Sequence, residues 1–428
     1  MKRNFATGFL AAAIAVTGAL AGGTLGTVQA AGGSNTVIDW NRIMLSTLAT
    51  AAVPAPPGTR LGAIVQTAVF DAVNGIEPQY TSIHVAPAAP RGASREAAAA
   101  GAAHTALVAM FPLQKGNLDA DLAASIAAIH LGEDSSPTAI ADGLAWGNSV
   151  AGQILAWRAG DGFNTVLPPY VPGTAPGDWQ PTPGGTGDPK FRTLAITTPF
   201  ALTSPSQFRP AGPPALSSEL YARDLAEVKA FGNTTSAVRS ATQTETAKFW
   251  QLDTVTAIWD RVADTLAIQH HYGLLRSARL LAFVDVALAD AAISVWDAKN
   301  TFNFWRPITA IGQADWTPLL TTPYFQEYPS GHSGASSAAA MVLASFFGNH
   351  TEFTVTSNGL PGVERSFRTF SSAVAQVADA RVFAGFHFRF SCNDASAMGA
   401  HVANYARETL MQPIKDGHEG TGGDGEQQ

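Results

Sequence analysis

Three cationic side chains and two histidines stand in three short segments that are typical of an anion site. The first segment runs from Trp296 to Pro307 and contains Lys299 and Arg306, seven residues apart. Seven residues make about two helical turns, so we expect both cations to project from nearly the same face of a helix. Because Pro307 disfavours helical geometry at the residue before it, this helix should end at Arg306.

Two cations on one apolar helix face repel each other unless an anion lies between them. Lys299 and Arg306 therefore predict an anion-binding face. The alternative is structural: both side chains could extend to solvent, or pair with a carboxylate such as Asp297.

The second segment is Tyr-Pro-Ser-Gly-His, which ends at His332 and leads into a run of Ala and Ser. Ser330 suits the N-cap of a helix that continues to Phe347, and Gly331 allows close backbone approach. The free amides and the dipole of a helix start favour an anion. His332 would then stand beside that anion as a general acid or base. A plain capping turn is the alternative.

The third segment runs from Ala380 to His387. Arg381 and His387 are six residues apart, which places them on different faces of an unbroken helix, but Gly385 lets the chain turn and bring them together. Arginine offers a planar fork to an oxyanion, and a neutral histidine offers a nitrogen lone pair. Alternatively, Arg381 pairs with Asp379 and His387 is a core residue.

The elements that must position these residues are predicted to be helical. Apolar residues recur at three-to-four spacing along most of the chain, so the fold class should be all-α. We expect an N-terminal helical region over residues 31–215 and a C-terminal catalytic helical bundle over residues 216–412. The predicted helices before and after residue 216 are Leu61–Val73, Arg95–Phe111, Leu118–Ile129, Ser218–Phe231, Thr244–Val262, Gly273–Trp305, Ser330–Phe347, Arg365–Val382 and Asp394–Met411.

Proline and glycine crowd residues 160–215, which excludes long helices there. A loop of this length inside a compact protein should wrap the surface or shape a pocket. Trp179, Phe200, Phe208 and Arg209 would anchor it. The best candidate for a strand is the run at residues 353–355, and the polar, Gly-rich tail at residues 413–428 is expected to be disordered.

Composition limits the classes of function. The chain has 428 residues, of which 46% are hydrophobic and 14% charged, which indicates a large buried core and argues against a disordered chain. The net charge of −7 and the lack of a basic cluster argue against nucleic-acid binding, so an anion site must be local. Cys392 is the only cysteine, which excludes an intramolecular disulfide; we interpret it as a small core residue.

The first 30 residues are typical of a signal peptide. Lys2 and Arg3 form a basic start, residues 9–20 are apolar, and Val28-Gln29-Ala30 offers small residues for cleavage. The mature protein should begin near Ala31 and be secreted, or periplasmic or extracellular. No later segment reaches the roughly 18 consecutive apolar residues of a membrane helix, so we expect no stable membrane insertion.

In this order and spacing, the three segments resemble the active-site signature shared by vanadium-dependent haloperoxidases and type 2 phosphatidic acid phosphatases. The resemblance covers most of residues 35–412 and is closest to the secreted bacterial haloperoxidases. The family often has Ser where this chain has Ala380, and many phosphatases have Asp where it has Ser391. That Asp orients the nucleophilic histidine, and Asp394 could replace it. The matching residues are Lys299, Arg306, Pro307, Pro329, Ser330, Gly331, His332, Arg381 and His387.

The resemblance implies helical bundles with two four-helix-bundle-type cores and a vanadate (orthovanadate) cofactor. His387 would be the ligand to vanadium, or the phosphoryl acceptor in a phosphatase, and His332 the acid or base beside it. Lys299 would also polarise the bound peroxide. Lys299, Arg306 and Arg381 would neutralise the oxyanion, with further donors from Ser330 and the Gly331 amide.

The aromatic residues near these motifs favour haloperoxidase chemistry, in which hydrogen peroxide oxidises a halide to a hypohalous equivalent. Trp296 and Phe325 would line the substrate pocket, and Phe325 resembles the Phe of chloride-oxidising members; both could equally be core aromatics. The alternatives are a secreted acid phosphatase with a phosphohistidine intermediate, favoured less because of Ser391, and a non-enzymatic anion-binding protein. A small organic acceptor and a homo-oligomer are compatible with the sequence.

Overall fold

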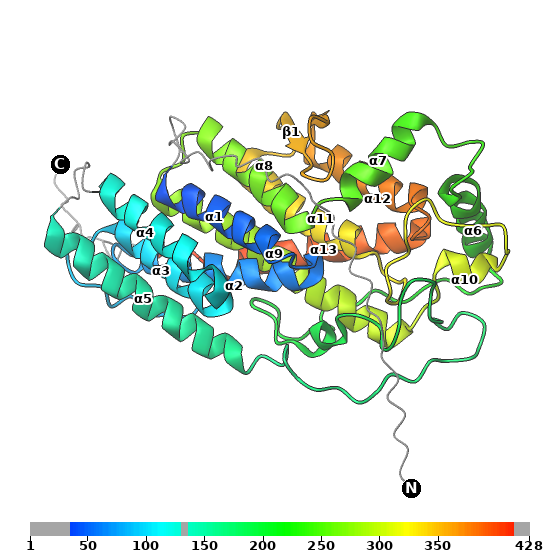
Figure 1. Ribbon diagram of the computed structural model, residues 1–428, viewed down its shortest axis with the longest axis horizontal. Coiled ribbons are helices and arrows are strands. Elements are labelled where there is room, and N and C mark those ends of the chain that lie inside the picture. Colours follow the sequence, from blue (N-terminus) through cyan, green and yellow to red (C-terminus); the bar gives the residue numbers. More distant parts are fainter. Residues whose placement is uncertain (1–34, 130–135, 415–428) are drawn as a thin grey trace, which may run out of the picture.

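The computed structural model describes residues 35–129 and 136–414 and confirms an all-α fold (Figure 1). Nearly every regular element is an α-helix, and the described strands form one short hairpin. No helix in these two ranges has the length and apolar character needed to cross a membrane. The predicted leader at residues 1–30 lies outside the described residues, as do residues 415–428 of the predicted tail.

The first part of the chain forms five helices that lie together on one side of the molecule (Figure 1). Helices α3 and α5 pack closely, because alanines and glycines form their interface. A Cβ on Gly147 would lie 2.2 Å from the Ala98 carbonyl oxygen, so only glycine permits this approach. The five helices are α1 (Thr36–Thr50), α2 (Ala55–Asn74), α3 (Arg95–Met110), α4 (Lys115–Ile129) and α5 (Pro137–Ala159).

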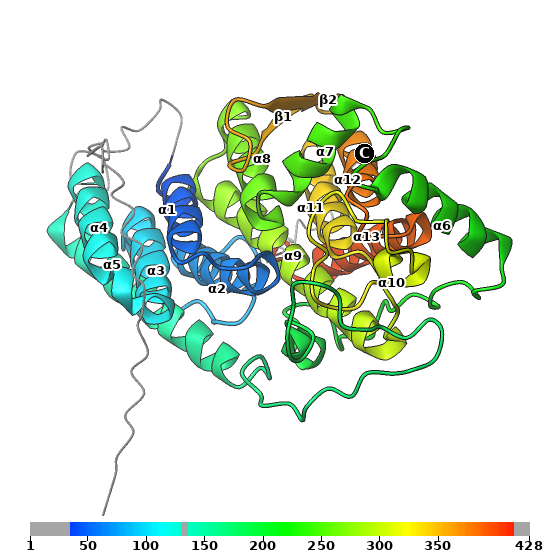
Figure 2. The same cartoon turned by 45° about the vertical axis from the view of Figure 1, so that its right-hand side comes forward.

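The second part is arranged around α9, a buried helix of 29 residues at the centre of the molecule (Figure 2). Helix α9 packs against α2 on one side and against α11 and α13 on the other, so it joins the two parts. The helices of this part are α6 (Glu219–Gly232), α7 (Ala241–Gln251), α8 (Val255–Gln269), α9 (Leu274–Phe302), α10 (Pro307–Ile311), α11 (Gly331–Phe347), α12 (Phe370–Phe383) and α13 (Arg389–Thr409).

The boundaries of α9 and α11 determine where the candidate site residues lie. Helix α9 ends at Phe302, where Asn303 adopts the left-handed conformation with φ of 48°. The expectation that it would continue to Arg306 is therefore wrong; Arg306 is the residue before the short helix α10. Ser330 is the N-cap of α11, as predicted, and accepts a hydrogen bond from the Ser333 amide.

The predicted strand is present as β1 (Phe353–Thr356), which pairs antiparallel with β2 (Glu364–Phe367). Phe353 and Val355 face the core from alternate positions of β1, while Thr354 and Thr356 are exposed, as the two-residue period of a strand requires. This hairpin covers one edge of α8 and lies away from the three predicted segments (Figure 2).

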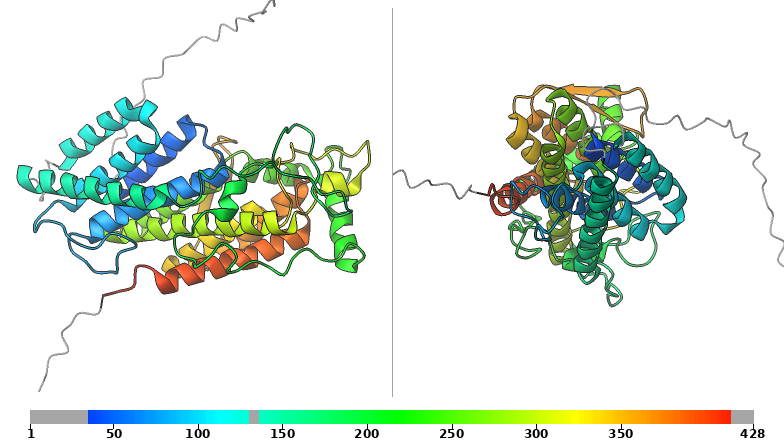
Figure 3. Two further views of the ribbon diagram at one scale, coloured as in Figure 1. Left: turned by 90° about the horizontal axis from the view of Figure 1, so that it is seen from below. Right: turned by 90° about the vertical axis from the view of Figure 1, so that its left-hand side faces the viewer.

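Residues 160–215 form an ordered loop that passes across the second group of helices (Figure 3), as predicted. Trp179 is buried, and its amide donates a hydrogen bond of 2.7 Å to the Asn303 carbonyl, directly after α9. Arg209 pairs with Asp297 on α9 at 2.6 Å. The loop therefore fixes the end of α9 that carries Lys299. Within the loop, the short 3-10 helix η2 (Arg192–Ile196) also packs on α9.

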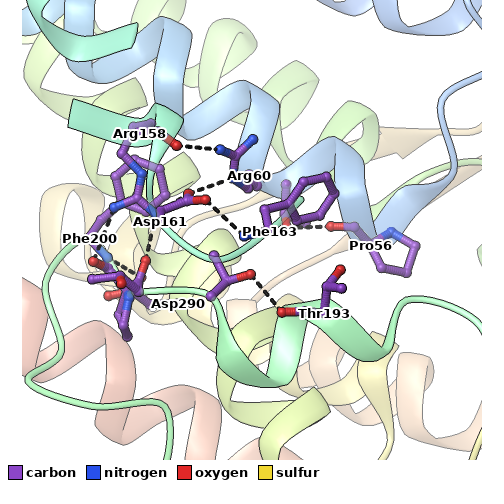
Figure 4. A network of polar contacts seen from close by, with 12 residues as sticks. Pro56, Arg60, Arg158, Asp161, Phe163, Thr193, Phe200 and Asp290 are labelled. Carbon is purple, nitrogen blue, oxygen red and sulfur yellow. Dashed lines mark hydrogen bonds and ion pairs between the residues drawn. The ribbon is translucent and has the colours of Figure 1, made fainter. Parts of the chain in front are cut away.

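A buried polar network attaches the loop to both helical groups (Figure 4). Asp161 accepts from Arg60 Nε of α2 and from Arg158 Nη2 of α5, each at 2.7 Å. On α9, the carboxylate of Asp290 accepts from three consecutive loop amides, those of residues 200–202, at 2.7 to 3.0 Å. Asp161 thus pairs two buried arginines, and Asp290 satisfies amides that the irregular backbone would otherwise leave unpaired.

Replacing Asp290 with alanine is expected to detach this part of the loop. Three buried amides would lose their acceptor, and each unsatisfied group costs about 1–3 kcal/mol. We expect destabilisation of about 3 kcal/mol and faster cleavage of the loop by a protease, measured by thermal unfolding and limited proteolysis. Asp178→Ala is the control, since its side chain accepts from one exposed amide. Equal resistance of Asp290→Ala and the wild type would contradict the anchoring role.

Three further carboxylates are buried between α2, α8 and α9. Those of Asp260 and Asp285 have no hydrogen-bond partner among the described residues, and Asp264 accepts from Asn41 Nδ2 at 3.0 Å. Asp285 approaches α2 so closely that a Cβ on Gly62 would lie 2.5 Å from its Oδ1. Burial, reinforced by mutual repulsion, raises the pKa of Asp260 and Asp285 well above the usual value, and burial raises that of Asp264 to about 7.

A raised carboxyl pKa means that the folded protein binds a proton that the unfolded chain has already released above about pH 4. These groups therefore cost stability increasingly as the pH rises from about 4 through their folded pKa values. Asp285→Asn is expected to remove part of this cost and to raise the unfolding temperature at pH 8 by about 2–4 °C, with little change at pH 4. Thermal unfolding across this pH range measures it; a variant less stable than the wild type at pH 8 would contradict the interpretation.

Candidate functional site

A cavity of about 350 Å³ opens between the two helical groups and ends at the predicted segments. Its outer wall is formed by the turn from Val53 to Pro56 and by residues 251–255, between α7 and α8. Its volume lies in the range of small-molecule sites. Its inner end is lined by Trp296, Phe325, Gly331, His332, Arg381 and His387.

Lys299 lies on the last turn of α9 and is fully buried. Its Nζ donates to the carbonyl oxygens of Gln326 at 2.8 Å and Glu327 at 2.7 Å. Since an ammonium group has three donors, one remains free. Burial, and next Arg306, lower the pKa of Lys299 well below its usual value. The alternative of solvent exposure or pairing with Asp297 is wrong, because Asp297 binds Arg209 instead.

Arg306 reaches the same place by another route than the predicted shared helix face. After α9 ends, the chain turns, and the guanidinium returns to donate from Nε to the Phe325 carbonyl at 2.8 Å and from Nη1 to the Phe386 carbonyl at 3.1 Å. Nη2 is buried without a partner among the described residues. Burial lowers the pKa of Arg306 to about 9.

Arg381 is buried near the C-terminal end of α12. Its Nη2 donates to Gln251 Oε1 at 2.7 Å, while Nε and Nη1 find no acceptor in the described parts of the chain. Burial lowers its pKa to about 10. The proposed surface pair with Asp379 does not form, because Asp379 binds Arg389 at 2.6 Å.

His387 follows the turn at Gly385, which has φ of 81°. A Cβ on Gly385 would lie 2.8 Å from the Gly232 carbonyl oxygen, so both the conformation and the packing require glycine. The imidazole is buried, with Nε2 at 3.2 Å from Arg306 Nη1. Burial and the neighbouring Arg306 lower the pKa of His387 well below its usual value, so we expect a neutral ring at neutral pH.

Glu327 is the residue that the sequence interpretation missed. Its Oε1 lies 2.7 Å from His387 Nδ1 and accepts from the Phe388 amide at 3.1 Å. The suggestion that Asp394 supports the histidine is wrong, because Asp394 accepts from the Tyr328 hydroxyl at 2.6 Å. Burial raises the pKa of Glu327 to about 7, against the opposing charges of Lys299 and Arg306.

The start of α11 supplies the remaining predicted residues. Ser330 Oγ accepts from the Ser333 amide at 3.4 Å and from the Ser333 hydroxyl at 3.1 Å, so its own hydroxyl hydrogen is available to a ligand. Gly331 lines the cavity beside Trp296. The Nε2 atom of His332 has no hydrogen-bond partner within the described residues, and burial and Arg381 lower the pKa of His332 well below its usual value.

Aromatic rings cover the cations on the cavity side. The ring centroids of Trp296 and Phe325 lie 5.2 Å apart, and Phe191 from the long loop packs on both. Lys299 Nζ lies 5.3 Å from the Phe325 ring centroid, and the Arg306 guanidinium carbon 4.9 Å. These contacts stabilise the cations and keep water from their apolar side.

Together, these residues form a positively charged cage. Three buried cations and one buried carboxylate give a formal charge of +2 (three minus one). Buried charges need partners, yet donors of Arg306 and Arg381 have none among the described residues. A tetrahedral oxyanion of two negative charges would satisfy these donors.

Within the described ranges, no group of three or more His, Cys, Asp or Glu could hold a metal ion. Cys392 is a buried core residue, and burial raises the pKa of its thiol to about 11.

Comparison with known proteins gives matches of three kinds. Residues 279–416 match the family model of the VCPO second helical-bundle domain. The vanadium chloroperoxidase of Curvularia inaequalis is 34% identical over 88 residues, which are 16% of this chain and 14% of that protein, so the match spans a small part of the relative's length. A structure described as the first bacterial vanadium-dependent iodoperoxidase is 27% identical, with a TM-score of 0.78, and the match covers 89% of this chain and 98% of that one.

A holo-type bacterial vanadium-dependent chloroperoxidase is 20% identical with a TM-score of 0.66, and the match covers 83% of this chain and 91% of that one. This likeness shows a shared fold. The family model covers α9 from Arg279 onward through α13, which is the part that carries every cation and histidine of the cage.

Proposed function

We propose that the chain belongs to the vanadium-dependent haloperoxidase family and is a vanadate-dependent haloperoxidase that oxidises halide with hydrogen peroxide to a hypohalous equivalent. One observation carries the proposal: three buried cations and His387 converge on the end of a cavity, with guanidinium donors that lack acceptors in the described residues.

These residues fit vanadate as they fit any tetrahedral oxyanion. Arg306 Nη2, Arg381 Nε and Nη1, and the third N–H of Lys299 are donors left over from the protein's own hydrogen bonds. His387 Nε2 would bind the metal centre. Once bound, vanadate supplies a Lewis acid at which hydrogen peroxide becomes able to oxidise a halide.

The protein's own contributions follow from the contacts. The cations offset negative charge without reorganising, because carbonyls and Gln251 already hold them in place. His332, neutral and with Nε2 unpaired in the described structure, can take a proton from incoming hydrogen peroxide and return it later. Lys299 would offer its remaining N–H donor to the oxyanion and polarise hydrogen peroxide that enters the cage.

The aromatic side of the cage supports halide oxidation in particular. Trp296 and Phe325 form an apolar surface at which a halide loses much of its hydration and water is a poor competitor. The cavity beyond them has room for a small organic acceptor. We therefore propose hydrogen peroxide and halide as substrates that enter through this cavity.

A second candidate function is phosphomonoester hydrolysis. Its support is the contact between His387 and Glu327, because a carboxylate on Nδ1 is what a nucleophilic histidine needs. The argument from Ser391 against this chemistry is thereby removed, since Glu327 supplies the carboxylate that position 391 lacks.

One experiment separates the two functions. Apoprotein is loaded with orthovanadate and assayed with hydrogen peroxide and iodide, bromide or chloride, beside hydrolysis of a generic phosphomonoester. Iodide is the most readily oxidised of the three, so we expect halogenation with iodide at least. Halogenation absent with every halide, beside brisk ester hydrolysis, would overturn the proposal in favour of the phosphatase.

We further propose that the protein is exported. The basis is the basic start, apolar run and small residues before Ala31. Expression of the full chain in a bacterial host, followed by N-terminal sequencing of the exported fraction, should yield a protein that begins near Ala31. A protein retained in the cytoplasm with its first residues intact would contradict export.

A further inference from the structure

Glu327 connects all three segments of the cage. Its amide donates to the Phe304 carbonyl at 2.9 Å, its carbonyl accepts from Lys299 Nζ at 2.7 Å, and its carboxylate contacts His387 Nδ1 at 2.7 Å. The residue is fully buried. Because its backbone is held at both polar groups, the carboxylate has little freedom to leave the histidine.

The two partners of His387 determine which ring nitrogen carries the proton. Arg306 Nη1, at 3.2 Å from Nε2, is a guanidinium nitrogen that can only donate. An ionised Glu327 carboxylate, at 2.7 Å from Nδ1, can only accept. If the proton were on Nε2, this N–H would face the N–H of Arg306 Nη1. The Glu327 carboxylate would then face the Nδ1 lone pair, and neither contact would be a hydrogen bond. Both contacts therefore require the tautomer with hydrogen on Nδ1.

We propose that Glu327 is a positioning residue: it holds His387 in the Nδ1–H tautomer and so presents the Nε2 lone pair to the oxyanion. The proposal rests on the proposed function only in that an oxyanion binds at this cage. It holds equally for vanadate bound at Nε2 and for a phosphoryl group attacked by Nε2.

The alternative is that Glu327 acts only through its charge. A negative charge near the cage opposes anion binding, so its neutralisation alone would make an anion bind more tightly. Loss of positioning would instead weaken binding, because part of the His387 population would present N–H in place of the lone pair. The two roles therefore predict opposite signs for Glu327→Leu, which removes both the charge and the acceptor.

The test measures orthovanadate affinity by titration of the apoprotein, in the wild type, Glu327→Leu and Asp394→Asn. Leucine offers no acceptor to Nδ1, so we expect Glu327→Leu to weaken binding about 10- to 100-fold, the usual effect of losing the hydrogen-bond partner of a ligating histidine. Asp394→Asn is the matched control, because this carboxylate contacts Tyr328 of the same segment but not the imidazole. We expect it to change affinity less than about threefold.

A double-mutant cycle with His387→Ala shows whether Glu327 acts through the histidine. In that background, Glu327→Leu is expected to cause no further weakening. Unchanged or tighter binding by Glu327→Leu alone would overturn the proposal, as would an equal loss in the presence and absence of His387.

Nitrogen NMR of the wild-type apoprotein gives a readout that needs neither a variant nor activity. With ¹⁵N-labelled histidine, we expect His387 to show a protonated Nδ1 and an unprotonated Nε2; a protonated Nε2 in a neutral ring would overturn the proposal. If this tautomer and the weakened binding are found but no halide is oxidised, the proposed function fails and the role of Glu327 stands. If the protein oxidises halide but His387 carries its proton on Nε2, the proposed function stands and the role of Glu327 fails.

Discussion

Replacing His387 with alanine is expected to abolish halogenation and to weaken orthovanadate binding strongly, leaving only the weaker binding that the three cations provide. The imidazole presents its neutral Nε2 beside the Arg306 guanidinium, so it is the group that would bind the vanadium. Loss of a group bonded directly to the reacting centre lowers activity by about a thousandfold or more. Orthovanadate titration and the peroxide-dependent assay measure both effects.

The variant also allows a rescue experiment. Removing the ring leaves a cavity beside Glu327 and Arg306, so free imidazole added to His387→Ala should restore part of the binding. His401→Ala is the control, because this ring is exposed and stacks on Phe208, and it makes no contact with the cations of the cage. Full activity in His387→Ala, or equal losses in the two variants, would show that the site has been placed wrongly.

Replacing Arg381 with alanine should weaken orthovanadate binding by about 10²- to 10⁴-fold. The side chain offers the oxyanion two buried N–H groups that have no acceptor among the described residues, and each hydrogen bond to a charged group contributes about 1.5–3 kcal/mol. The same change relieves repulsion among three buried cations, so the loss of binding should exceed any loss of apoprotein stability. Titration and thermal unfolding of the apoprotein give the two quantities.

Arg389→Ala is the matched control for this experiment. Arg389 lies eight residues further along the chain, and its guanidinium pairs with Glu227 and Asp379 outside the cage. We expect Arg389→Ala to keep orthovanadate affinity within about threefold of the wild type while it lowers stability. Equal affinities of Arg381→Ala and the wild type would remove Arg381 from the cage.

The sequence predicted which residues form the cage better than it predicted the backbone path that brings them together. The spacing of Lys299 and Arg306 suggested one continuous helix face, but the helix ends at Phe302. Asn303 adopts a left-handed conformation that helical periodicity does not reveal, and the chain then turns back toward the cage. The prediction at Gly385 was better founded, because a glycine between two functional residues is a local signal of a turn.

Glu327 was missed because its role depends on a long-range contact. It is separated from His387 by 60 residues, and nothing in the spacing of either motif relates them. A signal was nevertheless present: Glu327 is an acidic residue next to the apolar start of the second motif, three residues before Ser330. Buried carboxylates are rare without a partner, so an acidic residue at this position could have been predicted to contact a histidine of the site.

Most helices and the wrapping loop were predictable for different reasons. Two helix predictions were wrong in part: Thr244–Val262 is interrupted between α7 and α8, and Arg365–Val382 begins within β2. Helical periodicity and N-caps such as Ser330 are encoded locally, whereas the loop was recognised by its proline and glycine content. Its attachment through Asp161 and Asp290 could not be derived, because Asp161 pairs with Arg60 of a distant helix and Asp290 accepts from amides 88 to 90 residues earlier in the chain.

The central claim is that this cage binds vanadate and that the bound anion makes the protein a haloperoxidase. The most direct test titrates orthovanadate into apoprotein while bound vanadate and iodide oxidation are measured on the same samples. We predict that activity rises in proportion to occupancy and reaches its plateau at one vanadate per chain, and that phosphate competes. Saturation without oxidation of any halide, or no saturable binding, would contradict the claim.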